Sequence, residues 1–128
     1  MKHQIIGGAL ALADGRVLPL SKAVRAGDFI FVSGQLGLTA DGTLAGSDIE
    51  AQTRQSLENI KAILTDAGCS FAQVIKSTVW LVDRADFARF NQVYAQYYPV
   101  RAPARSTVVS GLVVPGALVE IETLVYAP

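Results

Sequence analysis

Two strand-like segments in the last quarter of the chain carry charged residues among apolar neighbours: Arg105 in the first, and Glu120 and Glu122 in the second. Because side chains alternate along a strand, Arg105 shares a face with Thr107 and Val109, and the two glutamates share a face of the next strand. A guanidinium among β-branched residues is costly to desolvate unless an anion meets it, and its planar fork suits a carboxylate or phosphate. The spacing alone favours a structural ion pair between Arg105 and one of the glutamates, with anion binding as the alternative.

The rest of the chain contains the elements that must position these residues. Asp14-Gly15 and Pro115-Gly116 are turn signals, and Ser47-Asp48-Ile49-Glu50 resembles a capping box with Ser47 as the cap. Gly68 can take the left-handed conformation that ends a helix. We expect two short strands within residues 4–20, a strand at 28–35, a helix from Asp48 to Gly68, a strand at 74–82, a helix from Asp83 to Pro99 with Phe87, Phe90, Tyr94, Tyr97 and Tyr98 as its apolar face, and strands at 104–110 and 118–126.

This order is β-β-β-α-β-α-β-β, and helices of this length between strands predict crossovers that pack both helices on one face of a mixed sheet. The other face would remain uncovered in a single chain. Hydrophobic residues make up 51 % of the sequence and charged residues 17 %, and the mean hydropathy is +0.35. We therefore expect a homo-oligomer whose interface is the uncovered face of the sheet.

Composition excludes several classes of function. The 128 residues predict a single domain over 1–128, and equal numbers of acidic and basic residues make nucleic acid an improbable ligand. Cys69 and His3 are the only residues of their types, which argues against a disulfide, a His/Cys metal site or a histidine-based triad. No apolar run is long enough to span a membrane, and residues 1–8 lack a long apolar signal core, so we expect a cytoplasmic location.

Two further positions could be structural or functional. Gly34, in the Ser33-Gly34 pair near the end of a strand, could mark a bulge or admit a close approach to the backbone, and the bulge is favoured. Asn91 shares the mostly apolar face of the second helix, where a buried amide needs partners. Its residue type favours capping of a neighbouring backbone group over contact with a ligand.

Several of these segments together resemble the YjgF-type Rid (reactive intermediate deaminase) family. The resemblance runs from about Ser21 to the C-terminal end, and the first twenty residues match poorly. Its most specific part is the pairing of an arginine strand with a glutamate strand after the helix that contains Asn91. The matching segments are Ser33-Gly34-Gln35, the helix from Asp48 to Gly68, Asn91-x-x-Tyr94, Pro103-Ala104-Arg105-Ser106-Thr107-Val108 and Leu118-Val119-Glu120-Ile121-Glu122.

The resemblance implies a chorismate-mutase-like α+β fold and a homotrimer with three clefts between subunits, without a metal or organic cofactor. The implied activity is hydrolysis of enamines and their imine tautomers, such as 2-aminoacrylate, to 2-keto acids and ammonia. Arg105 would hold the substrate carboxylate and Glu120 would position the attacking water. Asn91 and the backbone of Ser33-Gly34 would line the pocket, together with Thr107, at a position that is often cysteine in the family.

One segment departs from the family pattern. The typical Gly-Pro-Tyr-Ser is replaced by Leu18-Pro19-Leu20-Ser21, so Leu20 stands where an aromatic hydroxyl is usual. Together with Thr107, this makes one wall of the expected pocket less polar. A substrate larger or more apolar than the usual one is therefore an open alternative.

The sequence leaves three functions to compare. The first is a deaminase of 2-aminoacrylate-type intermediates, with a larger catabolic enamine such as 2-aminomuconate, or a pyrimidine-breakdown intermediate, as open alternatives. The second is a non-catalytic trimeric module that binds small carboxylates. The third is ribonuclease activity or translation inhibition, against which the neutral charge and the single histidine argue.

Overall fold

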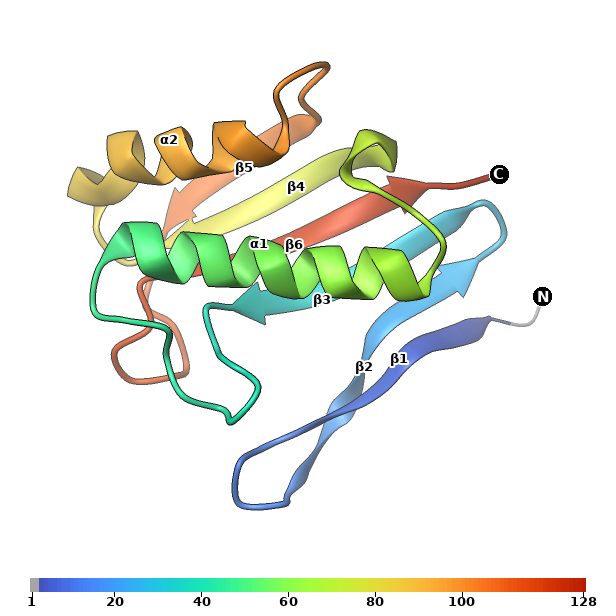
Figure 1. The fold of residues 1–128 in the computed structure, drawn as a ribbon, viewed down its shortest axis with the longest axis horizontal. Coiled ribbons are helices and arrows are strands. Elements are labelled where there is room, and N and C mark those ends of the chain that lie inside the picture. The colour runs from blue at the N-terminus through green and yellow to red at the C-terminus, as the bar shows by residue number, and fades with distance from the viewer. Residues whose placement is uncertain (1–2) are drawn as a thin grey trace.

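A computed structural model describes residues 3–128, and their strands form one six-stranded sheet in the order β1-β2-β3-β6-β4-β5 (Figure 1). Only β4 and β5 pair in parallel; the other neighbours are antiparallel. The predicted order of strands and helices is confirmed. The elements are β1 (Gln4–Ala11), β2 (Val17–Ala26), β3 (Phe29–Leu36), α1 (Ile49–Asp66), the 3₁₀ turn η1 (Phe71–Gln73), β4 (Val74–Leu81), the 3₁₀ turn η2 (Arg84–Asp86), α2 (Phe87–Tyr97), β5 (Ala104–Val109) and β6 (Val119–Tyr126).

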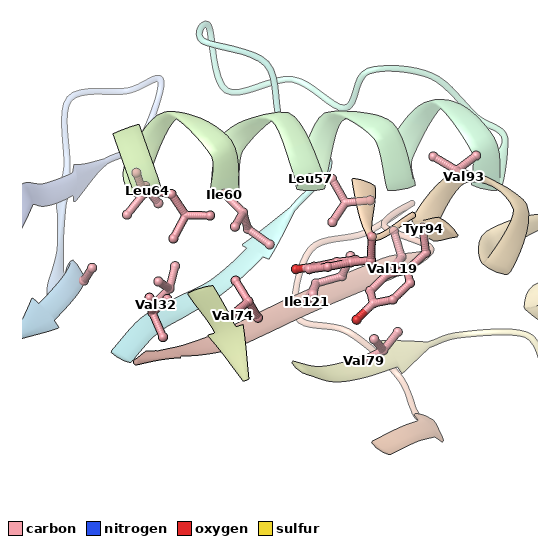
Figure 2. Packing of buried hydrophobic residues seen from close by; sticks show 14 of the residues in the cluster. Val32, Leu57, Ile60, Leu64, Val74, Val79, Val93, Tyr94, Val119 and Ile121 are labelled. Atoms are coloured by element: carbon pink, nitrogen blue, oxygen red, sulfur yellow. The ribbon is translucent and has the colours of Figure 1, made fainter. Parts of the chain in front are cut away.

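Both helices lie on the same face of the sheet, as predicted (Figure 1). Leu57, Ile60 and Leu64 on α1 point down onto the strands, toward residues such as Val32 and Ile121 (Figure 2). On β6, alternate side chains from Val119 to Val125 are buried beneath the helices, which is the period of a half-buried strand. The hydrophobic core therefore occupies the single layer between sheet and helices.

Two element boundaries differ from the prediction, and the predicted end of the first helix does not. β2 continues to Ala26, because antiparallel pairing with β3 extends it past residue 20. Asp48, rather than Ser47, caps α1: its backbone is extended and its Oδ1 accepts from the Ala51 amide at 2.8 Å. Both residue types cap helices well, so the sequence alone did not separate them. Gly68 has φ +74°, which confirms the predicted left-handed end.

The aromatic face predicted for the second helix is only partly correct. A 3₁₀ turn precedes α2, and Phe87, the first residue of the helix, remains 44 % exposed, while Val93 is buried with Phe90 and Tyr94. Tyr98, just past the helix, is also buried. Phe87 is therefore available to line a cavity rather than the core.

The face of the sheet opposite the helices is uncovered and largely apolar. Phe31 on β3 is 53 % exposed, and Val108 on β5 and Tyr126 on β6 are also exposed. An apolar surface of this kind in a single chain favours association with another copy. Within residues 3–128, no helix is both long enough and apolar enough to cross a membrane.

Gln52, which is fully buried on α1, holds two loops against the helix. Its Nε2 donates to the carbonyls of Gly46 at 2.9 Å and Gly116 at 3.1 Å. Its Oε1 accepts from the Leu118 amide at 2.7 Å, next to the start of β6. This one side chain therefore fixes the loop before α1 and the loop that leads into the glutamate strand.

Gln52→Met should lower the free energy of unfolding by about 3 kcal/mol, because a side chain of similar size leaves three backbone groups without their partners. Urea denaturation followed by circular dichroism measures this loss. Gln92→Met, at an exposed position on α2, is the matched control and should change stability by less than about 0.5 kcal/mol. Equal stability of the two variants would contradict the role given to Gln52.

Candidate active site

Arg105 lies on the edge strand β5 and faces α2. It is paired in register with the buried Ser77 of β4, so its side chain emerges on the helix side of the sheet. The guanidinium carbon lies 4.8 Å from the ring centroid of Tyr94, 5.4 Å from that of Phe90 and 5.7 Å from that of Phe87. These rings hold the cation by cation–π contacts without neutralising its charge.

The ion pair that the spacing favoured does not form within one chain. β4 lies between β5 and β6, and Arg105 and Glu120 project from opposite faces of the sheet. Among residues 3–128, Arg105 makes no salt bridge. Its charge is therefore available to an anionic ligand.

A cavity of about 440 Å³ opens beside Arg105, between β5 and the start of α2. The Oγ1 atom of Thr107 is buried and has no hydrogen-bond partner within the described chain, so a ligand can satisfy it. Arg105 and Thr107 were identified from the sequence. The other lining residues come from the end of β4, from η2, from the start of α2 and from the end of β5, and the sequence analysis did not place them in a pocket. The lining residues are Leu81, Arg84, Phe87, Arg105, Thr107 and Val109.

Glu120 lies on the opposite, uncovered face of the sheet, where it pairs with Trp80 of β4 and Leu36 of β3. Partial burial raises the pKa of the Glu120 carboxyl, and the negative charge of Glu122 raises it further. The carboxylate occupies the space above Gly34, where a Cβ atom would overlap it. Glu120 is thus a partly desolvated carboxyl group that lies against the backbone of Gly34.

Ser33 and Gly34 form an irregularity in the β3–β6 pairing, between Val32 and Gln35, so the predicted bulge is confirmed. The alternative for Gly34, a close approach to its backbone, is also correct because the Glu120 carboxylate makes that approach. The Ser33 hydroxyl donates to the carbonyl of Ser21 at 2.6 Å, which ties β3 to β2.

Leu20 and Asn91 complete the set of residues identified from the sequence. Leu20 lies on β2, next to Ser21, and is 40 % exposed. Asn91 is half-buried on α2, one turn from Phe87 and from Tyr94, on the side of the helix that faces Arg105. Its side chain makes no hydrogen bond to residues 3–128, so the capping role favoured by its residue type is not observed.

The structure therefore divides the expected site into two groups. The first, on the helix side of β5, contains Arg105, Thr107 and Asn91. The second, toward the uncovered face, contains Glu120 and the Ser33-Gly34 bulge. Within residues 3–128, no three acidic, histidine or cysteine side chains are close enough to share a metal ion.

The six-stranded mixed sheet with two helices on one face is the chorismate-mutase-like α+β fold. The family model for endoribonuclease L-PSP matches residues 14–127. A RutC family protein of Pyrococcus horikoshii is 47 % identical over 109 residues, covering 84 % of this chain and 86 % of its own. The human 2-iminobutanoate/2-iminopropanoate deaminase is 36 % identical over 115 residues, covering 89 % of this chain and 84 % of its own.

Solved structures agree with the sequence matches. E. coli TdcF with bound serine superimposes with a TM-score of 0.85 at 34 % identity, covering 98 % of this chain and 99 % of that one. RidA from the Antarctic bacterium Psychrobacter superimposes with a TM-score of 0.85 at 37 % identity, covering 96 % of this chain and 98 % of that one. The chain belongs to the endoribonuclease L-PSP family, which is the YjgF or Rid family, and the resemblance identified from the sequence is confirmed.

Proposed function

We propose that the protein hydrolyses 2-imino acids, formed from 2-aminoacrylate-type enamines, to 2-keto acids and ammonia. The observation that carries the proposal is the Arg105 guanidinium, held against three aromatic rings at the wall of a cavity and without an acidic partner in the described chain. Relatives named as imine deaminases, at 36 % and 40 % identity, support the reaction class.

Few catalytic groups are needed for this chemistry. Protonation of the enamine at carbon gives the imine, which is electrophilic at the carbon that bears nitrogen. Water adds to that carbon, and the resulting carbinolamine expels ammonia to leave the carbonyl. The net change is one imine and one water converted to one ketone and one ammonia. Arg105 would fix the carboxylate, and Glu120 would accept a proton from the attacking water.

The two groups can meet only if a second copy of the chain supplies one of them, because they lie on opposite faces of one sheet. We therefore propose a homotrimer in which the uncovered sheet faces are buried and the cavity beside Arg105 receives Glu120, Ser33 and Gly34 of a neighbour. Such an arrangement buries Phe31 and Tyr126 and gives three equivalent sites.

A coupled assay tests the proposal. Threonine dehydratase generates the enamine in place, and release of 2-oxobutanoate is followed with and without the protein. We expect an acceleration proportional to the concentration of added protein, and light scattering should give a mass of three times 13.6 kDa. A monomer without activity would overturn both the reaction and the assembly. Binding of 2-oxobutanoate without acceleration would indicate a carboxylate-binding module instead.

Gly34→Ala should reduce kcat/KM by about 10- to 100-fold, because the new methyl group displaces the Glu120 carboxylate from its place above the bulge. The backbone of Gly34 is not in the left-handed region, so the effect is steric rather than conformational. Gly111→Ala is the matched control: its Cβ meets nothing within 4 Å, and its activity should stay within about twofold of wild type. Equal activity of the two variants in the coupled assay would contradict the placement of Glu120.

A further inference from the structure

A second arginine lines the same cavity as Arg105. Arg84 begins η2, the 3₁₀ turn that leads into α2, and contributes to the cavity wall together with Leu81 and Val109. Neither the expected reaction on a small imino acid nor the core of the fold accounts for it. The wall of this cavity therefore contains two guanidinium groups, one more than a single carboxylate requires.

The backbone that carries Arg84 is well anchored. The Asp83 side chain accepts from the Ala85 amide at 2.9 Å, the Asp86 amide donates to the Asp83 carbonyl at 3.1 Å, and the Phe87 amide donates to the carbonyl of Arg84 itself. The turn therefore presents the side chain of Arg84 from a fixed position beside the cavity.

The neighbouring carboxylates do not neutralise Arg84. Asp86 is bound by Arg89 at 2.9 Å, and the Asp83 carboxylate accepts from the backbone of its own turn. Within residues 3–128, Arg84 forms no salt bridge and no side-chain hydrogen bond. In a single chain the cavity lining includes Arg84 and Arg105 but no acidic residue, and Glu120 of a neighbour, which the proposed assembly adds, would offset only one of the two positive charges.

We infer that the substrate carries a second anionic group, and that Arg84 binds it while Arg105 binds the carboxylate next to the imine. This inference rests on the proposed function and narrows the substrate class to imino acids with two acidic groups. The hydrolysis itself is unchanged, because the second group takes no part in bond making or breaking. Arg84 is thus a specificity-determining residue.

The length of the cavity wall also indicates how far apart the two anionic groups lie. Arg105 and Val109 are four residues apart on β5, about 13 Å along the strand, and Val109 lines the same part of the wall as Leu81, its partner on β4. The acidic groups should therefore be separated by several carbon atoms, with the chain between them lying over Phe87, Val109 and Leu81.

Keto acids matched in chain length test the inference, because they are the products of the corresponding imino acids. Titration calorimetry at low salt compares 2-oxoglutarate with 2-oxopentanoate, and 2-oxoadipate with 2-oxohexanoate. For wild type, each diacid should bind at least about tenfold more tightly than its monoacid, about 1.4 kcal/mol. Arg84→Gln should reduce that ratio to near one, with the larger loss of affinity for the diacids, and Arg84→Lys should restore part of it.

Arg54→Gln, which removes an exposed guanidinium from α1, is the control and should keep the wild-type ratio. Equal binding of diacids and monoacids by wild type would overturn the inference, as would an unchanged ratio in Arg84→Gln. Turnover of 2-iminobutanoate in the coupled assay separates this failure from failure of the proposed function. Turnover without a diacid preference overturns only the role of Arg84, whereas absence of turnover on both short and diacid imines overturns the reaction.

Discussion

Arg105→Lys should reduce kcat/KM for 2-iminobutanoate by at least about tenfold, and Arg105→Ala by about 100-fold or more. Lysine keeps the positive charge but loses the planar fork that binds a carboxylate through two parallel hydrogen bonds. It also lacks the flat guanidinium surface that rests on Tyr94 and Phe90. The coupled assay with threonine dehydratase measures the loss, and titration with 2-oxobutanoate should show a similar weakening of binding.

The control for Arg105 is retention of the fold. Arg105 is on an edge strand and makes no ion pair in the described chain, so both variants should keep the wild-type secondary structure and oligomeric mass. Arg101→Lys, in the exposed segment before β5, makes the same change of residue type away from the cavity and should leave activity unchanged. Full activity of Arg105→Lys would exclude the bidentate contact.

Glu120→Gln should reduce kcat by about 100-fold and leave the affinity for 2-oxobutanoate within about threefold of wild type. The amide has nearly the same shape but cannot accept a proton from water. The free energy of unfolding should not fall, because the substitution removes a charge that burial and Glu122 disfavour. Stopped assays measure kcat, titration calorimetry measures the affinity for 2-oxobutanoate, and thermal melts measure the change in stability. Equal losses in kcat and affinity would favour a binding or structural role.

The pKa of Glu120 also predicts the pH dependence of turnover. Water activation needs the ionised carboxylate, so activity should fall as the pH is lowered through the pKa of Glu120, which lies above its ordinary value. Glu122→Gln is the matched control on the same face of β6. It should keep turnover near neutral pH and move the acid limb to lower pH, because it removes the charge that helps to raise the pKa of Glu120.

Local patterns in the sequence predicted most of the fold. The alternation of β6 and the helical spacing on α1 depend on neighbouring residues alone, and both are confirmed. The shared faces of Arg105 with Thr107 and of Glu120 with Glu122 follow from the same period of two and are also correct. The cap at Asp48 and the extent of β2 were missed, because two adjacent residues cap equally well and strand length depends on pairing with β3.

The site was less predictable because it depends on which strands become neighbours. The placement of β4 between β5 and β6 sends Arg105 and Glu120 to opposite faces, and no local pattern contains that order. In the sequence Arg84 is an ordinary residue near a helix start, and only the tertiary structure places it on the wall of the cavity beside Arg105. The role of Gln52 was not predicted either, since two of its three partners, Gly116 and Leu118, lie in a loop that is distant from α1 in sequence.

The opposite orientation of Arg105 and Glu120 has a genetic consequence under the proposed assembly. Each site would draw its arginine from one chain and its glutamate from another, so alleles that lack one or the other would complement. Random co-assembly of equal amounts of two such inactive chains would give about a quarter of the sites both intact groups. Two variants that are each inactive alone would then show activity when they are co-expressed.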